Sequence, residues 1–276
     1  MKFYTTPYHH NLLKDDERLS VFNEAIVDYY KRNINLDNGK GNFKKLEKTV
    51  FDIGCGTGVL SFFASKYFHR IIAIDKDVKI LNYAKKSFEK NKNFNNITFY
   101  LEDALSCSFN EKADLIICEM LDTALIEEEE ILVLNKLHKY LKNNGEIIPK
   151  GFINIVEPVF MEGTNIQYDN YLKTLNHQIL GNFVKYSEFD FSKWIKQDFE
   201  TTVEFEIAKD SRLNGIKITS FTKLNQNFIC GPTPMMNSPL LIPIDDKNVV
   251  KGEKIKISLK YLMGGGLQTI KTAIIK

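Results

Sequence analysis

The first half of the chain alternates between short apolar runs and amphipathic segments. Apolar runs of strand length are expected at residues 49–53, 71–74, 97–100, 113–118 and 145–149. Helical spacing of apolar residues predicts helices over 15–33, 59–68, 78–90 and 129–141. Continuous apolar strands that alternate with helices are typical of a parallel sheet covered on both faces. With right-handed crossovers, this pattern predicts a doubly wound, Rossmann-like α/β domain.

After residue 150 the pattern changes to strict alternation of apolar and polar positions, most clearly over 203–207, 216–218 and 254–261. A period of two predicts antiparallel strands with one solvated face. We therefore predict an antiparallel β sheet or barrel domain at 151–276, with a short helix over 170–182. The first half is divided into a helical N-terminal segment at 1–34 and the Rossmann-like domain at 35–150, which opens with a polar loop over 35–48.

Composition narrows the class of protein. With 276 residues, 43% of them hydrophobic and 26% charged, the chain can bury a large core and is not disordered. Its net charge of +2 gives no sign of a nucleic-acid or membrane partner. The four cysteines lack CxxC spacing, which favours free thiols in a reducing compartment. No cluster of cysteine and histidine has the spacing of metal ligands, so we predict no metal site. We find no signal peptide or membrane-spanning run and expect a soluble, cytoplasmic protein.

A glycine-rich turn follows the first predicted strand. Its sequence is Asp52-Ile53-Gly54-Cys55-Gly56-Thr57-Gly58. Glycines between a strand and a helix let the backbone approach a ligand closely at the helix N-terminus. The GxGxG spacing departs from the GxGxxG fingerprint of NAD-dependent dehydrogenases, which are the competing interpretation.

Acidic residues follow the next two strands. Asp75 ends the second strand, about 20 residues after the glycines, where a doubly wound fold places a carboxylate to bind ribose hydroxyls. Asp103 and Ala104 follow the third strand, where an adenine edge would lie. The carboxyl ends of parallel strands share one edge of the sheet, so we expect these residues and the glycine turn to form one nucleotide site.

This ordered set resembles the class I S-adenosylmethionine-dependent methyltransferases. The resemblance implies that the glycine-rich loop holds the methionine part of S-adenosylmethionine, that the acid of the second strand holds the ribose, and that the acid after the third strand lies near the adenine. The cofactor-binding residues that it implies in the sheet domain are Asp52, Gly54, Gly56, Gly58, Asp75, Asp103 and Ala104.

The fourth strand runs into Cys118-Glu119-Met120-Leu121-Asp122-Thr123-Ala124-Leu125-Ile126-Glu127-Glu128. This segment is similar to the two-glutamate loop of protein arginine N-methyltransferases, in which two glutamates nine residues apart bracket the substrate guanidinium. The spacing selects Glu119 and Glu128 as catalytic residues. We attribute the other acids of the run, Glu127, Glu129 and Glu130, to the preference of a helix N-terminus for negative charge.

The segment from His9 to Arg18 is similar to the His-x-x-Met-Leu-x-Asp-x-x-Arg segment of the same family. The resemblance implies that His9 and Arg18 bind the cofactor, with Arg18 on its carboxylate, and that residues 1–34 form a lid. The family's barrel carries a Thr-His-Trp triplet after a Gly-Pro turn. Here residues 231–239 begin with that turn but have Asn237-Ser238-Pro239 in place of the triplet.

We therefore expect an S-adenosylmethionine-dependent N-methyltransferase that acts on arginine side chains of a protein or peptide. The segment after the sheet domain is short for the family's dimerisation arm, so we expect a monomer or a weak homodimer. One alternative is the same chemistry on another side chain or a small amine. A second alternative is a non-catalytic scaffold that binds the cofactor; the missing triplet favours it, whereas the intact glutamate pair argues against it.

Overall fold

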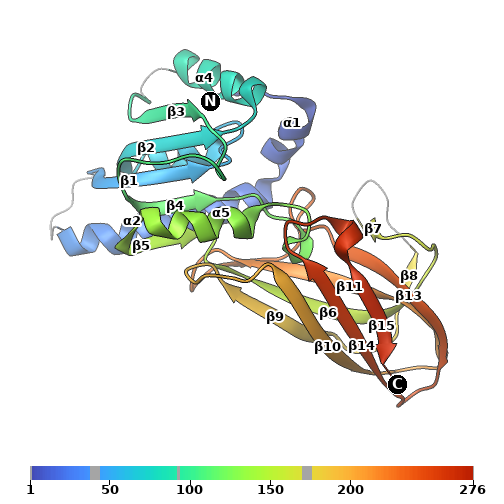
Figure 1. The fold of residues 1–276 in the computed structure, drawn as a ribbon. Coiled ribbons are helices and arrows are strands. Elements are labelled where there is room, and N and C mark those ends of the chain that lie inside the picture. Colours follow the sequence, from blue (N-terminus) through green and yellow to red (C-terminus); the bar gives the residue numbers. More distant parts are fainter. Residues whose placement is uncertain (1, 38–43, 92–93, 170–175, 276) are drawn as a thin grey trace.

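The computed structural model describes residues 2–37, 44–91, 94–169 and 176–275 (Figure 1). In these ranges the first half forms one fully parallel sheet in the order β3-β2-β1-β4-β5. Its strands are β1 (Leu46–Ile53), β2 (Phe68–Asp75), β3 (Ile97–Leu101), β4 (Ala113–Cys118) and β5 (Leu141–Ile148). The direction of winding reverses between β1 and β4. Ligands of open α/β sheets bind at such a switch point, beyond the carboxyl ends of the strands.

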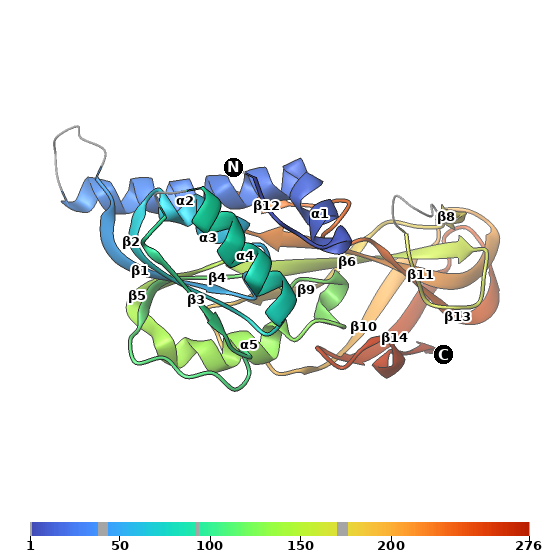
Figure 2. The same ribbon diagram turned by 90° about the horizontal axis from the view of Figure 1, so that it is seen from above.

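Helices cover both faces of this sheet. They are α1 (Pro7–Lys14), α2 (Asp16–Asp37), α3 (Val59–Ser65), α4 (Val78–Lys90) and α5 (Glu130–Leu137). Figures 1 and 2 show α2 and α3 on one face and α5 on the other. Helix α2 packs because Phe22, Ala25, Ile26 and Tyr29 recur on one side of it, each at most 1% exposed. No helix in the described ranges is long and apolar enough to cross a membrane.

The predicted elements differ from the observed ones mainly at their ends. The helix predicted over 59–68 ends at Ser65, because Phe68 begins β2 and is fully buried in the sheet. The helix predicted over 129–141 ends at Leu137 and is followed by a short 3₁₀ helix, η2 (His138–Tyr140), before β5. Helix α1 was not predicted; the side chain of Thr6 caps it by accepting the N–H of His9.

The polar loop predicted over 35–48 is shorter than expected. Helix α2 extends to Asp37 and β1 begins at Leu46, while residues 38–43 lie outside the described ranges. The short helix predicted over 170–182 is wrong where it can be compared, since β8 (His177–Ile179) is a strand; residues 170–175 lie outside the described ranges.

The second half consists of antiparallel strands, so the predicted fold class is confirmed. One sheet has the order β7-β13-β11-β6-β8, with β12 beside β11 and β9 beside β6, and the other has the order β10-β14-β15. The strands are β6 (Gly151–Met161), β7 (Gln167–Tyr168), β8, β9 (Val184–Asp190), β10 (Asp198–Glu206), β11 (Ser211–Lys223), β12 (Ile229–Cys230), β13 (Leu240–Val249), β14 (Lys254–Leu262) and β15 (Lys271–Ile275). The domain limits remain a prediction.

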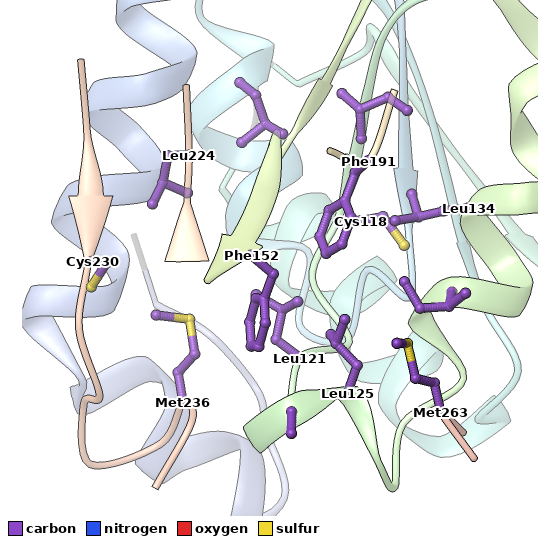
Figure 3. Close-up of a cluster of buried hydrophobic side chains, with 14 of the residues drawn as sticks. Cys118, Leu121, Leu125, Leu134, Phe152, Phe191, Leu224, Cys230, Met236 and Met263 are labelled. Atoms are coloured by element: carbon purple, nitrogen blue, oxygen red, sulfur yellow. The ribbon is translucent and has the colours of Figure 1, made fainter. Parts of the chain in front are cut away.

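The two halves share a hydrophobic core, part of which is drawn in Figure 3. Leu121 and Leu125, from the segment after β4, lie among Phe152, Phe191 and Met263 of the antiparallel half, all at most 8% exposed. The middle of the segment between β4 and α5 is therefore buried between both halves, whereas Glu127 and Glu128 near its end are exposed. The segment includes the two glutamates that the sequence marks as catalytic.

Candidate active site

The glycine turn after β1 requires its glycines. Gly54, Gly56 and Gly58 have φ values of +69°, +52° and +76°, in the region that only glycine adopts at little cost. A Cβ atom on Gly54 would also lie 3.0 Å from the side chain of Met120. Asp75 fixes the turn from the neighbouring strand, because its Oδ2 accepts the N–H of Gly56 at 2.8 Å.

Two adjoining cavities lie at the carboxyl ends of the parallel strands. Of the predicted residues, the first is lined by His9, Arg18, Asp52, Gly54, Gly56, Asp75, Glu119 and Glu128. The second is lined by Gly54, Asp75, Asp103 and Ala104. The structure thus brings together every predicted site residue except Gly58, which lines neither cavity. A Cβ atom on Gly58 would lie 2.9 Å from the ring of Phe88, which explains this glycine by packing.

Asp52 and His9 both line the first cavity near the glycine turn. Asp52 is 1% exposed and accepts the hydroxyl of Ser61 at 2.5 Å. Burial raises its pKa to about 6, although the bonds from Ser61 act in the opposite direction. The ring of His9 lies against Gly56, where an added Cβ would be 3.4 Å from its Cδ2. Burial lowers the pKa of His9, and this outweighs the nearby carboxylates of Asp75 and Asp77.

Arg18 is buried in the first cavity. Its Nη2 forms an ion pair with Glu119, and its Nη1 donates to the carbonyl of Leu12 at 3.4 Å. Burial acts to lower the pKa of Arg18, but Glu119, Asp15 and Tyr8 together raise it by more, so the guanidinium stays charged. No described residue accepts the N–H of its Nε. A buried guanidinium with an unused donor is suited to a further anionic group such as a carboxylate.

Glu119 and Glu128 reach the same cavity from the two ends of one loop. Glu119 directly follows β4, and Glu128 lies two residues before α5. Burial and the nearby carboxylate of Glu119 raise the pKa of Glu128. The same two carboxylates, together with burial, raise the pKa of Tyr8, whose side chain also lines the cavity. Tyr8 carries no sequence signal that would have marked it as a site residue.

Asp122 organises the loop between the two glutamates. Its Oδ2 accepts the N–H groups of Ile126 at 3.1 Å and Glu127 at 2.9 Å, and its Oδ1 accepts that of Glu128 at 3.2 Å. Burial raises the pKa of Asp122 to about 7, although these three bonds favour the charged form. The backbone position of Glu128 is therefore set partly by Asp122, which the sequence analysis did not identify.

Glu130 lies in the first turn of α5, as predicted, but it is buried. It is 0% exposed, and its Oε2 accepts the N–H of Met120 at 3.0 Å, next to Glu119. Its Oε1 is buried and has no partner among the described residues. Burial raises the pKa of Glu130 well above its usual range. The preference of a helix N-terminus for acids explains its position in the sequence but did not reveal its burial.

The segment that lacks the Thr-His-Trp triplet still reaches the site. Met235 lines the first cavity, and its N–H donates to Oδ2 of Asp15 at 2.9 Å. The same oxygen accepts the hydroxyl of Thr233 at 2.5 Å, while Oδ1 accepts the N–H of Arg18 at 3.2 Å. The carboxylate of Asp15 thus connects the N-terminal helices to the antiparallel half beside the cavity.

The groups present fit S-adenosylmethionine. Asp75 offers carboxylate oxygens at the end of β2, where ribose hydroxyls are bound in this fold. Arg18 offers the unused Nε donor for a carboxylate. Gly54 and Met120 line both cavities. A wall that offers both backbone and an apolar side chain can accommodate the polar methionine part of the cofactor and the apolar edge of its adenine ring.

Comparisons with known proteins agree with this geometry. A family model described as a methyltransferase domain matches residues 44–205. An uncharacterized protein of Methanothermobacter thermautotrophicus is 41% identical over 275 residues, covering 100% of both chains. A ribosomal protein L11 methyltransferase of Prochlorococcus marinus is 34% identical over 118 residues, 39% of this chain and 36% of that protein.

Among solved structures, the Trypanosoma brucei PRMT1 enzyme-prozyme heterotetrameric complex with AdoHcy superposes with a TM-score of 0.75. The match covers 92% of this chain and 87% of that one at 17% identity, so it extends the similarity of fold to the antiparallel half. The chain therefore belongs to the methyltransferase domain family, as a class I methyltransferase that uses S-adenosylmethionine and resembles the protein arginine N-methyltransferases.

Proposed function

We propose that the protein methylates a guanidinium nitrogen of arginine side chains in a protein or peptide. The observation that carries the proposal is the placement of Glu119 and Glu128 in one cavity with the glycine turn. Glu119 already binds a guanidinium there, that of Arg18. The planar guanidinium of an arginine side chain pairs well with carboxylates, so the two glutamates suit such an acceptor.

The two carboxylates address the chemical difficulty of this acceptor. A guanidinium is a poor nucleophile because its lone pairs are delocalised over the cation. When bound, S-adenosylmethionine supplies an electrophilic methyl group on a sulfonium. Glu119 and Glu128 would hold the guanidinium, orient one nitrogen and draw positive charge toward the others. The pKa of Glu128 is raised by burial and by Glu119, which makes this carboxylate a better proton acceptor than an ordinary glutamate for the proton that the nitrogen loses.

The test is transfer of a radiolabelled methyl group from S-adenosylmethionine to proteins of a cell extract, followed by acid hydrolysis and identification of the labelled amino acid. We expect methylarginine, and we expect Glu128→Gln to lower turnover by about 10²-fold, as loss of one electrostatic stabiliser does. Glu127→Gln is the matched control, because the Glu127 carboxylate accepts the hydroxyl of Tyr168 at 2.7 Å and lines neither cavity. Wild-type turnover in Glu128→Gln would contradict the proposal.

Transfer to another side chain is the second candidate, supported by the similarity of 118 residues to a ribosomal protein L11 methyltransferase. Labelled methyllysine, or a labelled amino terminus, in the same hydrolysate would identify it. Binding of S-adenosylhomocysteine without transfer to any component of the extract would instead support a scaffold. The absence of the Thr-His-Trp triplet is the feature that favours this outcome.

A further inference from the structure

The glycine turn after β14 contacts the loop that carries Glu128. The N–H of Gly264 donates to the carbonyl of Leu125 at 3.0 Å, and the N–H of Gly266 donates to that of Ile126 at 2.8 Å. A Cβ atom on Gly264 would lie 3.3 Å from the carbonyl oxygen of Glu128. Two hydrogen bonds and a close backbone approach therefore join the antiparallel half to this loop.

The loop has a conformation that requires such support. Ala124 and Leu125 have φ values of +60° and +61°, although neither is glycine, and both are fully buried. A left-handed backbone at a non-glycine residue is strained and persists only where its surroundings determine it. The N–H of Ala124 donates to Oγ of Ser220 on β11 at 2.9 Å, which supports the start of the loop. The glycine turn supports its end, and without it the carbonyls of Leu125 and Ile126 would lose these partners.

We propose that the turn formed by Gly264, Gly265 and Gly266 is a positioning element for Glu128. By binding the two carbonyls before it and contacting its own carbonyl, the turn sets where the Glu128 backbone lies, and thereby where its carboxylate meets the acceptor. This proposal rests on the proposed function in one respect, the contact between Glu128 and the acceptor. The φ values of Gly264 and Gly266, +71° and +87°, favour glycine at both positions.

The chain offers a matched control for the added methyl group. Gly252, in the turn before β14, has a φ of +83°, and a Cβ atom added to it would have no atom within 4 Å. Gly264→Ala and Gly252→Ala therefore impose a similar backbone penalty, but only Gly264→Ala pushes against Glu128. We expect Gly264→Ala to lower kcat for methyl transfer to extract protein by about tenfold or more, since small misplacements at a reacting centre have large effects. Gly252→Ala should retain wild-type kcat, and both should bind S-adenosylhomocysteine as tightly as the wild type.

Two further measurements separate positioning from general damage. If the turn acts through Glu128, Gly264→Ala combined with Glu128→Gln should be no slower than Glu128→Gln alone. Amide hydrogen exchange of residues 124–128 in the free protein should be faster in Gly264→Ala and unchanged in Gly252→Ala. Should Gly264→Ala fail to fold, Gly264→Asn replaces it, because asparagine tolerates left-handed backbone better than alanine.

The outcomes distinguish the two proposals. Unchanged exchange, or unchanged kcat, in the Gly264 variant would overturn the positioning role. The positioning role would also be overturned if kcat of the double variant fell by the product of the two single-variant losses. If exchange and kcat respond as expected but the labelled product is not methylarginine, the turn still positions Glu128, and the arginine assignment alone fails.

Discussion

Glu130→Gln should change the pH dependence of stability. Its free energy of unfolding should gain on that of the wild type as the pH rises. The carboxyl of Glu130 is 0% exposed, and burial raises its pKa well above that of an unfolded chain. Between the unfolded and the folded pKa, the native state therefore holds a proton that the unfolded state has released. Stability falls with pH in that interval, by up to about 1.4 kcal/mol per pH unit for one proton. Glu130→Gln removes this dependence.

A second substitution tests the hydrogen bond separately from the charge. Glu130→Gln keeps an oxygen that can accept the N–H of Met120, whereas Glu130→Leu leaves that N–H without its acceptor. An unsatisfied buried donor costs about 1–3 kcal/mol. The free energies of unfolding of the two variants should thus run parallel with pH, with the leucine variant lower by about that amount.

Urea unfolding at half-unit steps from pH 5 to pH 8 measures both effects. The difference in unfolding free energy between Glu130→Gln and wild type should grow toward high pH in favour of glutamine. A difference that is constant across this range would show that Glu130 titrates alike in the folded and unfolded states, which would refute the burial argument. Because Met120 adjoins Glu119, Glu130→Leu should also slow methyl transfer more than Glu130→Gln does.

Three other variants test the cofactor site and the loop. Asp75→Ala should weaken binding of S-adenosylhomocysteine at least tenfold in calorimetry, because a charge-assisted bond contributes about 1.5–3 kcal/mol and Asp75 also holds the N–H of Gly56; binding as tight as wild type would remove Asp75 from the site. Arg18→Lys should weaken it too, since an ammonium lacks the planar fork; unchanged affinity would argue against a carboxylate clamp. Asp122→Asn should lower kcat but not this affinity, because an amide cannot accept N–H bonds at both positions; a normal kcat would show that Asp122 does not position Glu128.

The fold could be predicted from the sequence where one pattern dominates. Strand β4 and helix α4 have the predicted limits, 113–118 and 78–90, since the strand is buried throughout and the helix has one apolar face. The predicted limits are wrong where an apolar residue fits both the helix pattern and the strand pattern. Phe68 and Leu141 are such residues, each at the junction of a helix and the following strand. Helix α1 could not be predicted by apolar spacing because it contains no buried residue.

The site was predictable where residues follow strand ends and was missed where contacts join distant segments. Asp75 and Glu119 follow β-strand patterns whose carboxyl ends meet at one edge, so their proximity follows from topology. The glycine turn at 264–266 was assigned no role, because its partners Leu125 and Ile126 lie about half the chain away. No spacing in a single sequence reports such a pair.

The segment that stands in place of the Thr-His-Trp triplet still contacts the N-terminal helices beside the cavity. Asp15 lies within the segment that resembles the arginine methyltransferases, and its carboxylate binds both Thr233 and Met235 of the segment without histidine and tryptophan. Because Asp15 is 3% exposed, leaving its carboxyl group without these partners would be costly, so these bonds stabilise the packing of the N-terminal helices against the antiparallel half. Met235 thereby lines the same cavity as Glu119 and Glu128. Under the proposed function, Met235 would contact the acceptor through shape and burial, whereas Glu119 and Glu128 would supply the charge that the acceptor meets.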